Sequence, residues 1–257
     1  MSLIEISGLL ASLVMGMVLG LVGAGGSILT VPILVYLFGL PPTQATGVSL
    51  AVVGGVALVG AVLASRKGEF DSKAAVIFGL PSVVIAFSIR RWLIPIIPAS
   101  LGPVSKDSAL LILFAAIMFV AARAMLRKSQ GPENQEPSVW RWLAGGIGAG
   151  VITGVLGAGG GGVIVAALSA GMGLPMRKAV GTSLAIIAMN STAGLTAEWM
   201  TQHTIDWVLV GQIGGIAVVG MFVGTALRSR VSSANLKTGF GYLVIAIAIF
   251  ILGQEIF

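Results

Sequence analysis

The feature that most constrains the fold is a glycine-rich stretch that occurs twice, 134 residues apart. The first copy, residues 20–27, reads GLVGAGGS, and the second, residues 154–162, reads GVLGAGGGG. The similarity continues without a gap, because 15 of the 32 residues in segment 20–51 are identical to their partners in segment 154–185. An apolar bias alone would not align Gly, Pro and Ser together, so we infer that one ancestral unit is used twice.

The composition places this repeat in a lipid bilayer. Of the 257 residues, 56% are hydrophobic and 9% are charged, whereas a soluble domain carries about 25% charged residues. Apolar runs of about 20 residues, the length that crosses a bilayer as a helix, recur along the chain. The first run begins close to Met1 without the basic segment of a cleaved signal peptide, so we expect it to be retained. The sequence therefore predicts an all-α polytopic membrane protein.

The apolar runs form two sets of five, separated by the only clearly hydrophilic stretch, the linker 127–141. We expect a first transmembrane repeat over residues 1–126 and a second over residues 142–257. The ten expected elements are residues 3–22, 27–38, 43–65, 72–89 and 107–126, then 142–156, 160–172, 177–200, 207–227 and 236–253.

Two parts of this division depart from simple membrane spans. The second and seventh elements are too short to cross a core of roughly 30 Å. The sequence leaves open whether these broken helices, with the runs before them, are re-entrant or fully spanning. Residues 90–106 are rich in proline and are expected to form a connection in the membrane interface.

Basic residues fix the expected orientation. If the turn at residues 66–67 is cytoplasmic, 12 of the 15 Lys and Arg residues lie inside, and only Arg90, Arg91 and Lys106 lie outside. The positive-inside rule favours this arrangement, which makes the linker cytoplasmic and both termini non-cytoplasmic. The net charge of +6 then reflects topology, and we expect no binding of nucleic acid.

The orientation has a consequence for the repeat. Because each set holds an odd number of elements, the two copies point in opposite directions across the membrane. Interrupted helices at matching positions of an inverted-topology repeat are typical of secondary transporters, whose substrate site lies near the midplane. The pattern therefore predicts alternating access between two halves.

The glycines at the two breaks are candidate substrate-binding residues. Freed backbone groups cannot face lipid, and the helix after each break presents unpaired N–H groups and a positive dipole end. Two such ends would form an anion cradle. The candidates are Gly25, Gly26 and Ser27 in the first repeat and Gly159, Gly160 and Gly161 in the second. The alternative is close packing of helices, which explains the GxxxG spacings at residues 16–20 and 150–154.

Polar side chains in the third element of each repeat extend the candidate site. They are Thr46 and Ser49 in the first repeat and Thr182, Ser183 and Asn190 in the second. Ser183 and Asn190 are seven residues apart and share a helix face. An Asn within a span is costly unless it meets a partner or a cavity. Asn190 is therefore expected either to bind substrate or to make an interhelical hydrogen bond.

Several chemistries are excluded by what the chain lacks. It has no Cys and a single His203, so thiolate sites, disulfides and histidine metal clusters are ruled out. We expect no metal, no cofactor and no catalytic residue, and predict that the protein is not an enzyme. Glu198 is the only candidate carboxylate within a span and is placed near an outer helix end. No buried cation is expected at the site.

The doubled motif resembles a known family. Residues 20–26 with Val31 and Pro32, and residues 181–185 followed by Asn190, are similar to the TauE/SafE family of membrane permeases, described as sulfite and organosulfur-anion exporters. The resemblance covers nearly the whole chain. It implies a bacterial-type inner membrane and an anionic sulfur substrate such as sulfite or a sulfonate. The two half-sites are not equivalent, because Thr46 corresponds to Val180.

The predicted function is secondary transport that exports a small sulfur-containing anion, sulfite or a sulfonate, by alternating access. The alternative is a proton- or sodium-coupled uptake transporter for another small anion or metabolite, which would need carboxylates within the membrane. The expected partners are the small anion and the lipid bilayer. The sequence leaves open whether the protein forms a homo-oligomer.

Overall fold

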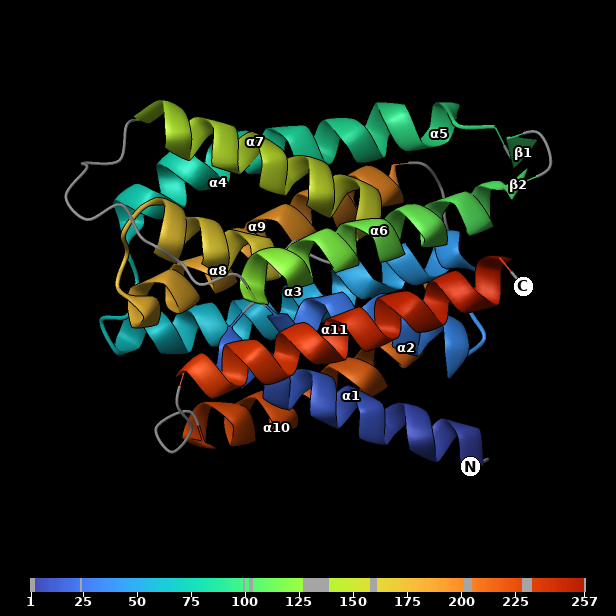
Figure 1. The fold of residues 1–257 in the computed structure, drawn as a ribbon, viewed down its shortest axis with the longest axis horizontal. Coiled ribbons are helices and arrows are strands. Elements are labelled where there is room, and N and C mark those ends of the chain that lie inside the picture. The colour runs from blue at the N-terminus through green and yellow to red at the C-terminus, as the bar shows by residue number, and fades with distance from the viewer. Residues whose placement is uncertain are drawn as a thin grey trace.

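Apolar helices make up almost all of the described chain, which in the computed structural model comprises residues 3–23, 25–98, 100–101, 104–126, 139–157, 161–200, 205–227 and 233–256. Most of the helices run along one axis, which is horizontal in Figure 1. Five of the described helices are long and apolar enough to cross a membrane: Pro42–Arg66, Ser72–Ile96, Val139–Leu156, Met176–Trp199 and Trp207–Leu227.

The described elements fall into a set before residue 127 and a set after residue 138. The first set consists of α1 (Leu3–Val22), the 3-10 helix η1 (Gly25–Leu29), α2 (Thr30–Tyr36), α3 (Pro42–Arg66), α4 (Ser72–Ser88), the π-helix η2 (Ile89–Leu93), α5 (Ile94–Ile96), β1 (Ser100–Leu101), β2 (Val104–Ser105) and α6 (Lys106–Leu126). The second consists of α7 (Val139–Leu156), α8 (Gly161–Ala166), the π-helix η3 (Ala167–Gly171), α9 (Met176–Trp199), α10 (Trp207–Leu227) and α11 (Ser233–Ile256). Of the predicted linker, residues 127–138 lie outside the described part, and α7 already begins at Val139.

Local sequence signals explain where several helices begin. Asp71 precedes α4 and its carboxylate accepts a hydrogen bond from the backbone N–H of Ala74 at 2.9 Å. Asp206 precedes α10 and accepts from Val208 and Leu209, each at 3.0 Å. Both are N-caps, which satisfy N–H groups that the first helical turn leaves unpaired.

The expectation that residues 90–106 form an interfacial connection is wrong for the first part of that segment. α4 continues through η2 into α5, which gives one apolar span from Ser72 to Ile96. Only beyond this span does the chain make a short antiparallel turn, in which Ser100 pairs with Ser105. Because the helix continues, Arg90 lies within the bundle rather than in a surface connection.

The helices pair across the two halves of the chain. α1 packs against α10, α7 packs against α4, and α3 packs against α9. Small residues make these contacts close: a Cβ atom at Gly16 would collide with the backbone of Ala217, and one at Gly150 with the backbone of Ser82. The packing role predicted for the GxxxG glycines is therefore confirmed.

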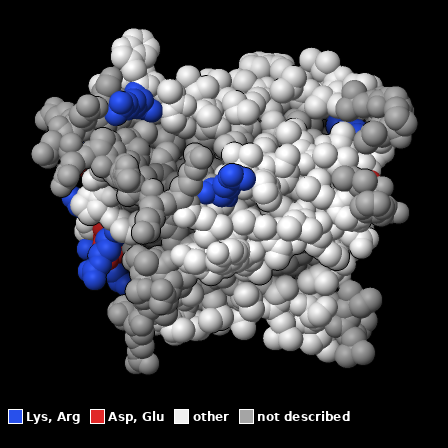
Figure 2. Space-filling view, in the orientation of Figure 1, with Lys and Arg blue, Asp and Glu red and all other residues white. Residues whose placement is uncertain are grey.

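The two ends of the bundle differ in which chain ends and which charged side chains lie there. Both termini lie at one end, on the right in Figure 1, whereas α6 ends and α7 begins at the other. The face in Figure 2 is almost free of charged side chains, and most of its basic atoms lie towards the left end. Large apolar side chains such as Val84, Val120 and Ile249 are exposed on this bundle. A lipid environment explains that exposure, since water would not tolerate such a surface.

Candidate functional site

The two glycine-rich breaks end helices as predicted. α1 ends at Val22 and α7 ends at Leu156, and the next residues, Gly23 and Gly157, have φ angles of +87° and +64°. Only glycine adopts this left-handed conformation without strain, so each break is set by its first glycine. After the breaks, η1 and α8 contact each other.

One glycine that follows the first break, Gly26, is accounted for by packing. Gly25 begins η1, and Gly26 lies so close to α1 that a Cβ atom there would collide with the carbonyl of Met15 and with Leu19. Ser27 is buried. In the second repeat Gly161 begins α8, whereas the predicted site residues Gly159 and Gly160 lie outside the described residues.

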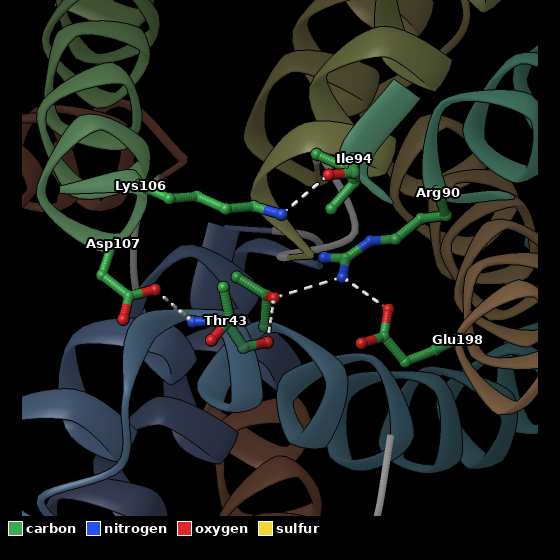
Figure 3. Close-up of polar contacts among 7 residues, drawn as sticks. Thr43, Arg90, Ile94, Lys106, Asp107 and Glu198 are labelled. Atoms are coloured by element: carbon green, nitrogen blue, oxygen red, sulfur yellow. Dashed lines mark hydrogen bonds and ion pairs between the residues drawn. The ribbon is translucent and has the colours of Figure 1, made fainter. Parts of the chain in front are cut away.

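A charged cluster lies at the start of α3, beside the second break. Arg90, in η2, is 3% exposed, and its Nη1 atom donates to Oε2 of Glu198 at 2.9 Å and to Oγ1 of Thr46 at 3.1 Å (Figure 3). Thr46 in turn donates to the backbone carbonyl of Thr43 at 2.8 Å. The cluster therefore joins α3, the α4–η2 span and the end of α9.

Two further contacts brace the same end of the molecule. Lys106, the first residue of α6, donates to the backbone carbonyl of Ile94 at 2.8 Å. The backbone N–H of Thr43 donates to Oδ1 of Asp107 at 3.3 Å (Figure 3). α6 is thus tied to the α4–η2–α5 span and to α3, the two elements that present Arg90 and Thr46.

The expectation of no buried cation at the site is wrong. Arg90 is buried and bonded to Thr46, a predicted site residue. Glu198 lies near the end of α9, as expected, and is 5% exposed. The sequence held one signal for this pair, because Arg90 was among the three basic residues that the positive-inside rule placed outside. A basic residue on the outer side does not follow the positive-inside rule, so its presence needs another cause. In this structure Arg90 is buried and bonded to Glu198.

A second polar cluster surrounds Asn190. Its amide nitrogen donates to Oγ of Ser82 at 2.6 Å and lies 3.4 Å from Oγ1 of Thr153, which joins α9 to α4 and α7. The interhelical hydrogen bond that was one of two expectations for Asn190 is therefore present. The carbonyl oxygen of the same side chain has no hydrogen-bond partner among the described residues.

The remaining predicted site residues are dispersed. Thr182 accepts a hydrogen bond from the backbone N–H of Asp71 at 2.9 Å, beside the turn between α3 and α4. Ser183 donates to the carbonyl of Val180 at 2.7 Å, one turn back in its own helix. Ser49 is buried, and its hydroxyl has no hydrogen-bond partner within the described chain. Of the predicted hydroxyl and amide residues, Thr46 is the one that the described contacts join to Arg90.

A small cavity lies at the opposite end of α3 from Thr46. Its volume is about 30 Å³, and its lining includes Lys67, Glu69, Val180 and Thr225. Over the residues that the structure describes, no group of three His, Cys, Asp or Glu side chains could hold a metal ion.

These features define a polytopic helical membrane protein with polar clusters inside an apolar bundle. The family model described as sulfite exporter TauE/SafE matches residues 8–251. The chain therefore belongs to the TauE/SafE family of membrane transporters.

Two bacterial relatives, each named a probable membrane transporter protein, match the chain over most of its length. A probable membrane transporter protein of Xylella fastidiosa is 33% identical over 253 residues, which cover 93% of this chain and 92% of the relative. The probable membrane transporter protein YdhB of Bacillus subtilis is 28% identical over 240 residues, or 93% of this chain and 96% of the relative. No solved structure is significantly similar to the chain.

Proposed function

We propose that this protein is a secondary transporter, and not an enzyme, that exports a small sulfur-containing anion such as sulfite or a sulfonate. The family supports transport, and the description of the family model supports sulfite and export. The observation that carries the choice of an anion is Arg90, a cation buried between helices beside one of the two breaks. A buried charge within a membrane span is costly and usually serves a substrate or ion pathway.

The packing supports alternating access by two inverted repeats. A Cβ atom at Gly23 would collide with Val180, and one at Gly157 would collide with Thr46. Val180 and Thr46 occupy the same position in the two repeats, as do Gly23 and Gly157. Each break therefore rests on the third helix of the other half, in the same way at both places. Two equivalent contacts of opposite direction would allow one half to rock against the other around a site between them.

The proposed site extends from Arg90 to the junction of the two breaks. Thr46 belongs to it through its hydrogen bond with Arg90, and Ser49 lies one turn further along α3. The glycines of η1 and α8, with Ser183 and Asn190, remain proposed binding residues of the inner part of the path. We place the protein in a bacterial-type inner membrane with both termini outside the cytoplasm, since this orientation satisfies the positive-inside rule.

The test is efflux from reconstituted vesicles. Purified protein in vesicles loaded with radiolabelled sulfite should release it faster than protein-free vesicles, and excess unlabelled methanesulfonate inside should slow the release. Efflux no faster than from protein-free vesicles would contradict the proposal. Uptake that requires an imposed sodium or proton gradient would support the alternative, a coupled uptake transporter.

A further inference from the structure

Arg90 uses only one of its guanidinium nitrogens in the contacts that the structure shows. Nη1 donates to both Glu198 and Thr46, whereas Nε and Nη2 are buried and have no hydrogen-bond partner among the described residues. Unpaired donors of a buried charged group are costly in a protein interior. The two nitrogens are therefore strong donors that nothing in the described chain satisfies.

These two nitrogens form one edge of the planar guanidinium. Their N–H bonds point side by side, which is the fork that binds two oxygens of a carboxylate or phosphate. Sulfite, sulfonates and sulfate also carry two or more oxygens on one atom, whereas a halide offers a single acceptor. The free edge of Arg90 therefore matches oxyanions better than halides.

The neighbours of Arg90 hold the guanidinium in place from the side opposite to this buried edge. Glu198 and Thr46 engage the third nitrogen and so fix the plane of the guanidinium. Gly157 lies beside Nη2, and a Cβ atom there would stand 2.5 Å from it. Glycine at this position thus keeps the approach to Nη2 free of a side chain.

The opposite end of the molecule has no charged side chain at the positions that match Thr46 and Glu198. By the 134-residue offset, Thr46 corresponds to Val180 and Glu198 to Ala64, and both counterparts line the small cavity. The fold closes around Val180 and Ala64 without a charge at either position, so the charges at the other end serve something other than packing.

The counterpart of Arg90 follows from how the glycine helices pack. Gly154 meets Ala86 of α4, and Gly20 meets Met221 of α10. Four residues further along these helices come Arg90 and Thr225. Thr225 also lines the cavity, so a neutral hydroxyl stands where the first end has a guanidinium.

We propose that the Nε–Nη2 edge of Arg90 binds the transported anion and restricts the substrate to oxyanions with at least two oxygens on one atom. This inference rests on the proposed transport function, to which it adds the group that binds the anion and the reason why a halide would not replace it. Glu198 and Thr46 act as positioning residues, because they orient the guanidinium from its other side.

Anion binding to the purified full-length protein tests the proposal without transport. The melting temperature in detergent is measured against sodium methanesulfonate, sulfate and chloride at equal ionic strength. Methanesulfonate and sulfate should stabilise the wild-type protein and chloride should not. The variant R90K keeps the charge but loses the fork, and its Kd for methanesulfonate should rise about tenfold or more. R91K makes the same change at an exposed neighbour and should bind like the wild type.

Three results would overturn the proposal: equal stabilisation by chloride, no stabilisation by any oxyanion, or an R90K variant that binds methanesulfonate like the wild type. If R90K does not fold, the wild-type comparison still decides, and E198Q offers a second variant that retains the fork. E198Q should keep its preference for methanesulfonate over chloride, and equal binding of both would count against Arg90.

The sulfite efflux assay separates this proposal from the proposed function. If R90K releases sulfite with an unchanged KM, Arg90 does not bind the substrate, although the protein still transports it. If methanesulfonate binds through Arg90 but the vesicles release no sulfite, the oxyanion site is supported and the proposed export is contradicted.

Discussion

At the scale of single residues, Gly157 is the position where backbone conformation and the charged cluster meet. Its φ of +64° disfavours any side chain, and a Cβ atom would stand 2.5 Å from Nη2 of Arg90 and 2.6 Å from the carbonyl oxygen of Thr46. We expect Gly157→Ala to lower the free energy of unfolding by about 1–3 kcal/mol from crowding, in addition to the backbone strain. Thermal unfolding in detergent and sulfite efflux would both report the change.

The matched control for this substitution is Gly39→Ala. Gly39 has nearly the same φ, +66°, but nothing lies within 4 Å of a Cβ atom there. It therefore suffers the backbone strain alone, and the difference between the two variants measures the crowding around Arg90. Equal losses of stability and of efflux in both variants would show that the contact with the cluster has no role.

Sequence reasoning found some of these residues and missed others for a physical reason. Thr46 was predicted because it lies near the start of a helix that follows a glycine break, and both of these are local patterns. The pairing of Arg90 with Glu198 was not recognised, because it joins residues 108 positions apart and depends on how α4 and α9 pack. Arg90 and Arg91, followed by two prolines, resemble the boundary of a membrane span. Only the course of η2 shows that Arg90 is buried within the bundle.

At the scale of elements, glycines decide which helices pair. α7 packs against α4 through Gly150, where a Cβ atom would collide with the carbonyl of Ser82. We expect Gly150→Leu to separate the two helices, disturb the nearby contact between Asn190 and Ser82, and reduce stability by about 1–3 kcal/mol or more. The amount of folded protein extracted from membranes and its melting temperature measure the effect.

Gly148→Leu, two residues earlier on the same helix, is the control. Gly148 is exposed and a Cβ atom there meets nothing within 4 Å, so leucine would face lipid and leave folding unchanged. If the two variants behaved alike, packing of α7 on α4 would not be the reason for glycine at position 150.

Most element boundaries could be predicted because they depend on local chemistry. The expected run 207–227 is α10, and α1 ends at Val22, directly before the first glycine of the break. The continuation of α4 could not be predicted, since two arginines and Pro95 favour a helix end. The π-helix η2 carries the chain through this segment and places Arg90 among α3, α7 and α9. Such an irregular turn is set by tertiary contacts and often marks a functional site.

At the scale of the whole molecule, the arrangement of the ends bears on membrane topology. Both termini lie at one end of the bundle, and α6 ends and α7 begins at the other (Figure 1). Single cysteines can be introduced without a background, because the chain has none. Ser105 is exposed near the end that holds the termini, and we expect Ser105→Cys to react with an impermeant maleimide in spheroplasts. Asn134 lies in the linker, and we expect Asn134→Cys to react only after lysis. Labelling of position 134 from outside would reverse the proposed topology.

The energy source of export depends on the charges that the whole bundle holds. Among the described residues, the buried charged side chains are Arg90 and Glu198, which bond to each other, so no chain of acidic groups forms a proton or sodium relay. An inside-negative potential favours anion exit by about 2.3 kcal/mol per charge per 100 mV. For a monoanion this corresponds to a gradient of roughly 50-fold, since about 1.4 kcal/mol is a factor of ten.

We therefore expect electrogenic, uncoupled export. In vesicles loaded with sulfite, a potassium diffusion potential that is negative inside should accelerate efflux, and the opposite potential should slow it, at equal pH on both sides. Protein-free vesicles with the same potentials control for leakage. Efflux that ignores the potential but follows a pH gradient would instead show proton coupling. Glu198 would then be the carboxylate to examine, because it contacts Arg90 directly, and in that case Glu198→Gln should abolish the dependence of efflux on the pH gradient.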